Sequence, residues 1–200
     1  DIAGYGWANN GRIVYAQDRG GDENFHAFGV DIDGGNAREL TPFDDVRVQF
    51  VDELEDDDDH MLIAMNRRDR RVFDVYRIDV HSGELELVAE NPGNVSGWLT
   101  DNAGRLRAAT TSDGVTTSLL YRDTEDEPFR SLVTLSFKET LAPLYFTFDD
   151  QKLYVSSNIG KVNLAEASRA VLPFVAVQIA VLFLISYVPE ISLLLPRVMG

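Results

Sequence analysis

FHAFGVDIDGGNARELT, residues 25–41, aligns without a gap to FDVYRIDVHSGELELVA, residues 73–89, at an offset of 48 residues. Three aligned pairs are identical, namely Phe25/Phe73, Asp31/Asp79 and Gly35/Gly83, and four keep their apolar character, namely Phe28/Tyr76, Val30/Ile78, Ile32/Val80 and Leu40/Val88. A strand–turn–strand repeat of about 40 to 50 residues predicts the blades of a β-propeller, because each small sheet buries its faces only against its neighbours. Two similar hairpins in a β-sandwich are the alternative.

Short apolar runs continue this pattern through residues 1–160. They are residues 12–16, 25–31, 61–65, 73–80, 84–89, 106–110, 117–122, 132–135, 144–148 and 152–156. Turn pairs separate them, at Asn10-Gly11, Gly34-Gly35, Ser82-Gly83, Ala103-Gly104 and Asp113-Gly114. The sequence therefore predicts a mainly β protein, a partial β-propeller of about three to four blades of antiparallel sheet.

The composition changes abruptly near Gly160. Residues 1–160 carry 31 acidic and 15 basic side chains, whereas residues 161–200 carry two acids and three bases. The segment Ala170–Val188, AVLPFVAVQIAVLFLISYV, has no charge over 19 residues. As a helix it would be about 28 Å long, close to the apolar thickness of a bilayer. We therefore expect two domains, a partial propeller over 1–160 and a helical tail over 161–200.

That tail predicts one membrane span at about residues 170–188, with a buried core helix as the alternative. The protein would then be membrane-associated, in the bacterial inner membrane if inserted. The flanking charges Lys161, Arg169 and Arg197 weakly favour a cytoplasmic body.

The charge balance and the missing cysteines exclude several classes. A formal net charge of −15 argues against nucleic-acid binding, which needs clustered Lys and Arg. The absence of Cys excludes disulfides, thiolate metal sites and a Cys nucleophile. The chain opens at Asp1 without a secretory signal, which suggests a piece of a longer reading frame.

A resemblance to a known family rests on several segments of the body. These are residues 5–18, YGWANNGRIVYAQD, with Gly21–Asn24, Val30–Asp31, Leu40–Pro42, Asn66–Tyr76, Gly83–Asn91 and Phe146–Tyr154. They resemble the amino-terminal propeller of prolyl oligopeptidase-type serine peptidases. The resemblance implies a domain that gates or binds substrate for a following α/β-hydrolase domain. It implies as partners a peptide, or a hydrolase domain that this chain lacks.

Catalytic residues are not predicted. The nucleophile elbow G-x-S-x-G is absent, and the nearest string, Gly93–Gly97, has the wrong spacing and is interpreted as a loop. His26, His60 and His81 lie in strand or acidic turn contexts that do not suggest a triad. We therefore predict no catalytic, cofactor-binding or metal-binding residue, no cofactor, and no enzyme activity for this chain alone.

Three charged clusters have both a ligand-binding and a structural interpretation. Asp56–His60 could hold Ca²⁺, but it lacks the spaced pattern of a calcium loop and is better explained as a solvated loop. Asp18, Asp22, Glu23 and Asn24 are expected to cap a hairpin. Arg67–Arg71 could face an acidic partner or a peptide carboxylate, although pairing with nearby acids is favoured. Trp7 and Trp98 are expected to pack between blades.

The tail has a separate resemblance. Residues 169–200, ending in PEISLLLPR at Pro189–Arg197, resemble the end of the large membrane subunit of tripartite ATP-independent periplasmic (TRAP) transporters. The favoured prediction is thus a non-catalytic propeller fragment fused to a membrane helix. The alternatives are a fragment of an organic acid transporter permease, or a chimeric chain without a function of its own. A gene fusion, a misassembled reading frame or a generated sequence would each produce such a chain.

Overall fold

The computed structural model describes residues 1–9, 11–158 and 164–187. The chain divides into two compact units, Asp1–Asn158 and Ile159–Gly200. The described residues of the first unit form the strands β1 (Ile2–Asn9), β2 (Arg12–Gln17), β3 (His26–Asp31), β4 (Arg38–Glu39), β5 (Val48–Asp52), β6 (His60–Asp69), β7 (Val72–Asp79), β8 (Leu85–Ala89), β9 (Val95–Thr100), β10 (Leu106–Ser112), β11 (Thr116–Tyr121), β12 (Arg130–Ser136), β13 (Leu141–Phe146) and β14 (Leu153–Ser157).

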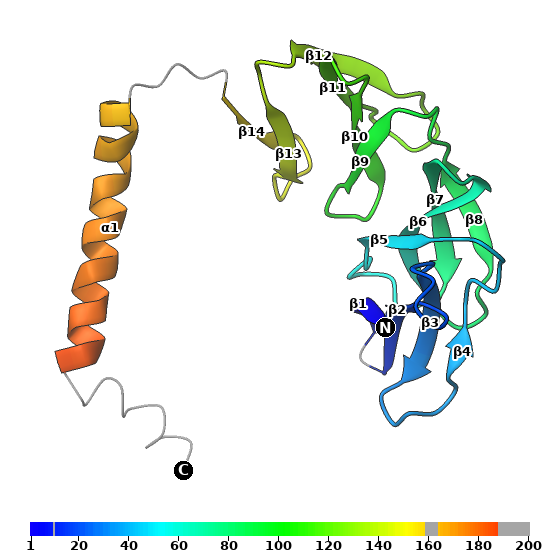
Figure 1. The fold of residues 1–200 in the computed structure, drawn as a ribbon. Helices are drawn as coiled ribbons and strands as arrows, with labels where there is room; N and C mark the ends of the chain where they lie inside the picture. The colour runs from blue at the N-terminus through cyan, green and yellow to red at the C-terminus, as the bar shows by residue number, and fades with distance from the viewer. Residues whose placement is uncertain (10, 159–163, 188–200) are drawn as a thin grey trace. The chain divides into compact units, whose positions relative to one another are not determined.

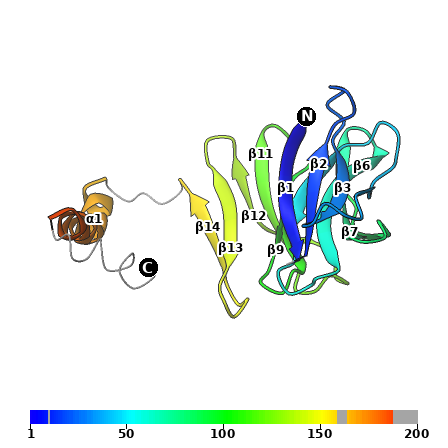
Figure 2. The same ribbon diagram turned by 90° about the horizontal axis from the view of Figure 1, so that it is seen from below.

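These strands form antiparallel sheets in chain order. Three sheets have four strands, β1–β4, β5–β8 and β9–β12, and the last has two, β13 and β14. We call them blade 1, blade 2, blade 3 and the half-blade. Figures 1 and 2 show the sheets following one another in an arc, with β1, β5, β9 and β13 on its inner side. This is the arrangement of propeller blades, and it confirms the mainly β prediction.

The sequence repeat corresponds to the two outer strands of blades 1 and 2. In blade 1, Phe28 of β3 lies opposite Glu39 of β4, and in blade 2 Tyr76 of β7 lies opposite Leu87 of β8. Both pairs are 48 residues apart, so the gapless alignment has the register of the structure. The repeat is therefore a repeat of blades.

Four strands were not predicted, namely β1, β4, β5 and β9. Gly93–Gly97, interpreted as a loop, lies partly in β9, which begins at Val95. Three of the missed strands are the first and innermost strands of their blades. These strands are rich in Gly or polar residues and lack the continuous apolar run that marks a central strand.

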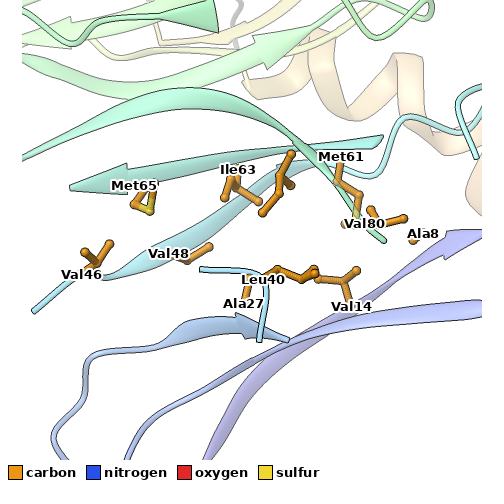
Figure 3. Packing of buried hydrophobic residues seen from close by; sticks show 11 residues of the cluster. Ala8, Val14, Ala27, Leu40, Val46, Val48, Met61, Ile63, Met65 and Val80 are labelled. Atoms are coloured by element: carbon orange, nitrogen blue, oxygen red, sulfur yellow. The ribbon is translucent and has the colours of Figure 1, made fainter. Parts of the chain in front are cut away.

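The apolar core lies between the blades. One cluster joins Val14, Ala27 and Leu40 of blade 1 to Met61 and Ile63 of blade 2, and Figure 3 shows these side chains facing one another across the gap between the two sheets. Further clusters join blade 2 to blade 3 and blade 3 to the half-blade. Each blade thus depends on its neighbour to bury a face.

An aromatic residue recurs near the end of each inner strand. Phe50, Trp98 and Phe146 each belong to the cluster that joins their sheet to the preceding one. Trp7 also lies near the end of its inner strand, β1, but no described sheet precedes β1, and the Trp7 side chain is 52% exposed. The expectation that both Trp residues pack between blades therefore holds for Trp98 and fails for Trp7.

The second unit contains the helix α1, Leu164–Tyr187. The helix carries Arg169 near its start. Among the described residues, no helix is long and apolar enough to cross a membrane. The predicted transmembrane helix at Ala170–Val188 is therefore wrong, and so is the predicted location in the bacterial inner membrane with a cytoplasmic body. Val188 and the Pro189–Arg197 motif lie outside the described residues.

Candidate functional site

A cleft of about 590 Å³ opens where the inner strands of blades 2 and 3 and the half-blade end. Asp52 is the last residue of β5, Thr100 of β9 and Phe146 of β13, and all three line the cleft. The loops that follow these strands complete its walls. The cleft therefore arises from the blade repeat, because each inner strand delivers its last residue to the same end of the arc.

A hydrogen bond ties two of these strands together at the base of the cleft. The Thr100 hydroxyl donates to one carboxylate oxygen of Asp52, and the other oxygen accepts from the Leu54 backbone N–H at 2.7 Å. Leu54 itself is buried and has a φ of 56°. Asp52 thus fixes the start of the β5–β6 loop, residues 53–59.

Asp57 organises the rest of this loop. Its carboxylate accepts from the backbone N–H groups of Asp59 and His60 at 3.0 and 3.1 Å, and lies 3.0 Å from the His60 Nδ1. Burial works to raise the pKa of Asp57, but these hydrogen bonds outweigh burial and lower the pKa below its usual value. Asp57 is therefore held as a carboxylate that caps the loop.

The other acids of this loop are exposed. Among the described residues, no ion pair holds Glu53, Glu55, Asp56 or Asp58, and all four residues are exposed. Glu55 and Asp56 line the main cleft, and Glu53, Glu55 and Asp58 line a smaller neighbouring one with Trp7. This end of the arc therefore carries a concentration of uncompensated negative charge.

Asp101 forms the second wall. Its fully buried carboxylate accepts from Arg105 Nε at 2.8 Å and Arg107 Nη1 at 3.2 Å, and from the backbone N–H groups of Ala103 and Arg105. Burial acts to raise the pKa of Asp101, but the hydrogen bonds from the arginines prevail and lower it. The Arg107 guanidinium also lies 5.1 Å from the ring centres of Tyr121 and Phe146.

Asp101 and Arg107 were not singled out from the sequence. The sequence feature that could have indicated them is the turn Asp101-Asn-Ala-Gly104. In this turn the Asp101 carboxylate accepts a hydrogen bond from the backbone N–H of Ala103, and Gly104 has a φ of 70°. The role of both residues is to fix the β9–β10 turn at the cleft.

The third side is aromatic. Tyr145 is 60% exposed and Phe148 is fully exposed, and both line the cleft beside buried Phe146. Arg77 of β7 also lines the cleft, and it pairs with Glu125 at 3.4 Å and Glu86 at 3.7 Å. The cleft thus offers carboxylates and exposed aromatic faces, a combination that attracts cationic groups.

The charged clusters noted in the sequence have structural partners. Asp22 accepts from the backbone N–H groups of Arg19 and Asn24, as a turn-capping carboxylate does. Asp18 is buried and paired with the Asp1 amino group. Within Arg67–Arg71 the partners are Asp74 for Arg68, Asp45 for Arg70, Asp69 for Arg71 and the Phe43 ring for Arg67, which matches the favoured expectation of local pairing.

The histidines are separated from one another. His26 is buried in β3, where its Nδ1 lies 2.8 Å from the Thr41 carbonyl oxygen. His60 begins β6 and His81 follows β7, where it lies 3.6 Å from Asp59. In the part of the chain that the structure describes, no three His, Asp or Glu side chains are grouped to hold a metal ion.

Comparison with known proteins gives two sequence relatives. The chain is 30% identical over 169 residues to dipeptidyl aminopeptidase BIII of Pseudoxanthomonas mexicana. This match covers 80% of this chain and 24% of the relative. It is 46% identical over 48 residues to the C4-dicarboxylate TRAP transporter large permease protein of Rhodobacter capsulatus, which covers 24% of this chain and 11% of that protein. No family model matches.

Among solved structures, the tricorn protease superposes with a TM-score of 0.54 at 16% identity, over 78% of this chain and 15% of that one. A putative TolB from Agrobacterium tumefaciens has a TM-score of 0.45 at 14% identity, over 64% of this chain and 47% of that one. The first unit is similar to a peptidase-type propeller. The chain spans about a quarter of the length of the dipeptidyl aminopeptidase, and its match to the permease is short.

Proposed function

We propose that the first unit is a non-catalytic, substrate-binding part of a peptidase-type protein, and that it holds polypeptide in the cleft at the ends of β5, β9 and β13. The observation that carries this proposal is the cleft itself, which combines exposed carboxylates on one side with Tyr145 and Phe148 on another. The similarity to a dipeptidyl aminopeptidase supports peptide as the ligand class.

The geometry favours extended, positively charged polypeptide. Backbone amides and apolar side chains of a peptide suit the aromatic wall, whereas Lys or Arg side chains suit Glu55 and Asp56. The surplus of negative charge on the body would accelerate encounter with such a ligand and make binding sensitive to salt.

The test is fluorescence anisotropy of a labelled ten-residue peptide rich in Lys, titrated with the full chain at low salt. We expect saturable binding, weakened at least about threefold by Glu55→Gln with Asp56→Asn, since each exposed charge pair contributes only modestly. Asp44→Asn is the matched control, because Asp44 precedes β5 and lies at the opposite end of the strand from Asp52.

Two outcomes would contradict the proposal. One is equal binding of a Glu-rich peptide of the same length. The other is a control variant that weakens binding as much as the cleft variants. Labelling of the chain by a serine-directed fluorophosphonate would separately contradict the non-catalytic assignment.

We also propose that the chain joins two unrelated parts near Gly160. The division into compact units after Asn158 supports this boundary, as do two relatives with unrelated activities in their names. Sequencing across residue 160 in the source DNA tests whether a gene fusion made this junction: one continuous reading frame is expected for a fusion, and a junction absent from the source DNA would show a misassembled reading frame instead.

A further inference from the structure

The β13–β14 turn, residues 147–152, is fastened to the β9–β10 turn of blade 3 through Asn102 and Asp150. One carboxylate oxygen of Asp150 accepts from the Asn102 backbone N–H at 3.1 Å and from the Asn102 side-chain amide at 2.6 Å. The same amide group also donates to the Thr147 carbonyl oxygen at 2.7 Å. We call these three hydrogen bonds the turn lock, because they join the turn of the half-blade to that of its neighbour.

Two arginines of blade 3 reinforce the turn lock. Arg107 Nη1 donates to the Asp150 carbonyl oxygen at 3.3 Å, and Arg105 Nη2 lies 3.6 Å from the second carboxylate oxygen of Asp150. Arg107 is buried, whereas Arg105 is exposed. Asp150 is therefore held through both its main chain and its side chain.

Asp150 occupies a backbone position that the neighbouring turn gives to glycine. The Asp150 N–H donates to the Thr147 carbonyl oxygen at 2.8 Å. The Gly104 N–H donates to the Asp101 carbonyl oxygen at 3.0 Å in the same way. Asp150 and Gly104 have φ values of 55° and 70°, a conformation that glycine adopts without strain and that Asp tolerates at some cost. Asp150 therefore places a carboxylate where glycine would form the turn more easily.

The turn lock holds the backbone on both sides of Phe148, which lines the cleft. The Thr147 carbonyl that accepts from Asn102 belongs to the peptide bond that precedes Phe148. Asp150 follows Phe148 by two residues and is fixed to the same Asn102. The place of the Phe148 ring relative to the rest of the cleft therefore depends on these hydrogen bonds.

We propose that Asp150 is a positioning residue of the cleft, which through Asn102 holds the Phe148 ring where an apolar side chain of a bound polypeptide packs on it. Asp150 is not among the residues that line the cleft, so it acts through its turn. A ring that is already held in place loses less freedom when a ligand covers it. This inference rests on the proposed function and deepens it: the polypeptide should carry apolar residues beside its Lys or Arg.

The experiment is fluorescence anisotropy with two labelled ten-residue peptides of equal charge, titrated with the full chain at low salt. One peptide consists of Lys and Ser, and in the other two of the Ser residues are replaced by Leu. The parent protein should bind both, because Lys meets the acidic loop in each, and should bind the Leu peptide about fivefold more tightly. The Lys–Ser peptide therefore reports on the proposed function, and the ratio of the two dissociation constants reports on the aromatic wall.

Asp150→Gly separates positioning from stability. It removes the carboxylate but suits the φ of 55°, so the urea midpoint should not fall through strain. The preference for the Leu peptide should nevertheless drop below about 1.5-fold, because the Phe148 ring is no longer held. Asp150→Asn keeps an oxygen that accepts from Asn102 and tolerates the same backbone, so it should retain the preference.

The matched control is Asp113→Gly. This change removes a carboxylate that accepts from the Val115 N–H at 2.8 Å in the β10–β11 turn. That turn follows the end of β10 and lies at the opposite end of blade 3 from the cleft. The control therefore removes the same charge as Asp150→Gly and should leave the preference for the Leu peptide unchanged.

Hydrogen exchange tests the turn lock without any peptide. The Asn102 backbone N–H donates to the Asp150 carboxylate, so Asp150→Gly should raise its exchange rate at least about threefold. Asp113→Gly should leave this rate unchanged.

The proposal is overturned if the Asp150→Gly protein keeps the full preference for the Leu peptide, or if exchange at Asn102 is unaffected by that change. A parent protein that binds the Lys–Ser peptide but does not prefer the Leu peptide would overturn this inference and leave the proposed function standing. A parent protein that binds neither peptide would overturn both.

Discussion

At the scale of single residues, Asp74 of blade 2 is a buried carboxylate that depends on several hydrogen-bond partners. Its carboxylate is fully buried and accepts from Arg68 Nε at 2.8 Å, from Arg68 Nη2 at 2.7 Å and from the Asn91 backbone N–H at 2.7 Å. One buried acceptor thus joins the β6–β7 hairpin to the segment that leads into blade 3. A buried donor or acceptor without its partner costs far more than a partner pair contributes.

Asp74→Asn should therefore lower the free energy of unfolding by about 1–3 kcal/mol. The NH₂ group of the new amide would face the N–H donors of Arg68 and Asn91 and could not accept their hydrogen bonds. Urea unfolding measures this change. Asp69→Asn, which breaks the exposed pair with Arg71, is the control and should leave the urea midpoint unchanged. Equal losses for the two variants would show that burial is not what makes Asp74 important.

Gly83 joins two blades through its lack of a side chain. It has a φ of 76°, and a Cβ at this position would lie 2.7 Å from the Leu40 carbonyl oxygen of the blade 1 segment. Gly34, in the corresponding turn of blade 1, has a φ of 83° and open space around it. The two glycines therefore share a left-handed backbone but differ in their surroundings.

Gly34→Ala should cost about 1 kcal/mol for the left-handed conformation alone, whereas Gly83→Ala should cost at least about 2 kcal/mol, because the backbone of Leu40 must also move. Urea midpoints of the two variants give the difference directly. If Gly83→Ala proved no worse than Gly34→Ala, the close approach of the two blades at this turn would be wrong.

At the scale of elements, the outer hairpins were predictable and the inner strands were not. β2, β3, β6 and β7 carry alternating or continuous apolar residues that a strand pattern detects. β1, by contrast, reads IAGYGWAN, and its Gly6 allows the close approach of the Glu53 side chain instead of supplying an apolar side chain. Strands near the axis of the arc need small or polar residues, which removes the signal used to find them.

The cleft escaped prediction for a related reason. Its lining residues Asp52, Thr100 and Phe146 come from three strands that lie 48 and 46 residues apart. The first spacing is the blade period and the second is two residues shorter, so the repeat found in the outer hairpins, extended to the inner strands, would have brought these residues to one end. The structure was needed to show that Glu55 and Asp56 flank them.

Phe146 is the buried aromatic side chain of the contact between blade 3 and the half-blade. Phe146 is 5% exposed and packs with Leu119 and Ala108, whereas Phe148, two residues on, is fully exposed. Phe146→Ala should lower the free energy of unfolding by about 3 kcal/mol or detach the half-blade. Phe148→Ala should change it by less than about 0.5 kcal/mol.

Hydrogen exchange separates the two effects of Phe146→Ala. Detachment should remove protection from β13 and β14 while β6 and β7 stay protected, because local units open independently. Protection of β13 and β14 that is unaffected by the variant would contradict the role given to Phe146.

At the scale of the whole molecule, charge acts on stability in two opposite ways that pH separates. The formal net charge of −15 creates repulsion at pH 7, and this repulsion weakens toward the isoelectric point near 4.5. Several carboxylates have a folded-state pKa below the ordinary 3.8, because they accept hydrogen bonds in turns or from arginine; Asp57, Asp79, Asp101 and Asp113 are among them. The folded protein therefore binds fewer protons than the unfolded chain near pH 4.

A group whose pKa is lowered by folding contributes its full stabilisation above the unfolded pKa and loses it as the pH falls through the folded pKa. We therefore expect the urea midpoint to hold or rise from pH 7 to about 5 as repulsion is relieved, and then to fall steeply below about pH 4 as these carboxylates take up protons. Asp101→Asn should be less stable than the parent at pH 7 and should lose less on acidification, since the variant has no carboxylate there to protonate. A midpoint that keeps rising down to about pH 3 would mean that repulsion, not the capping carboxylates, controls the acid behaviour of this fold.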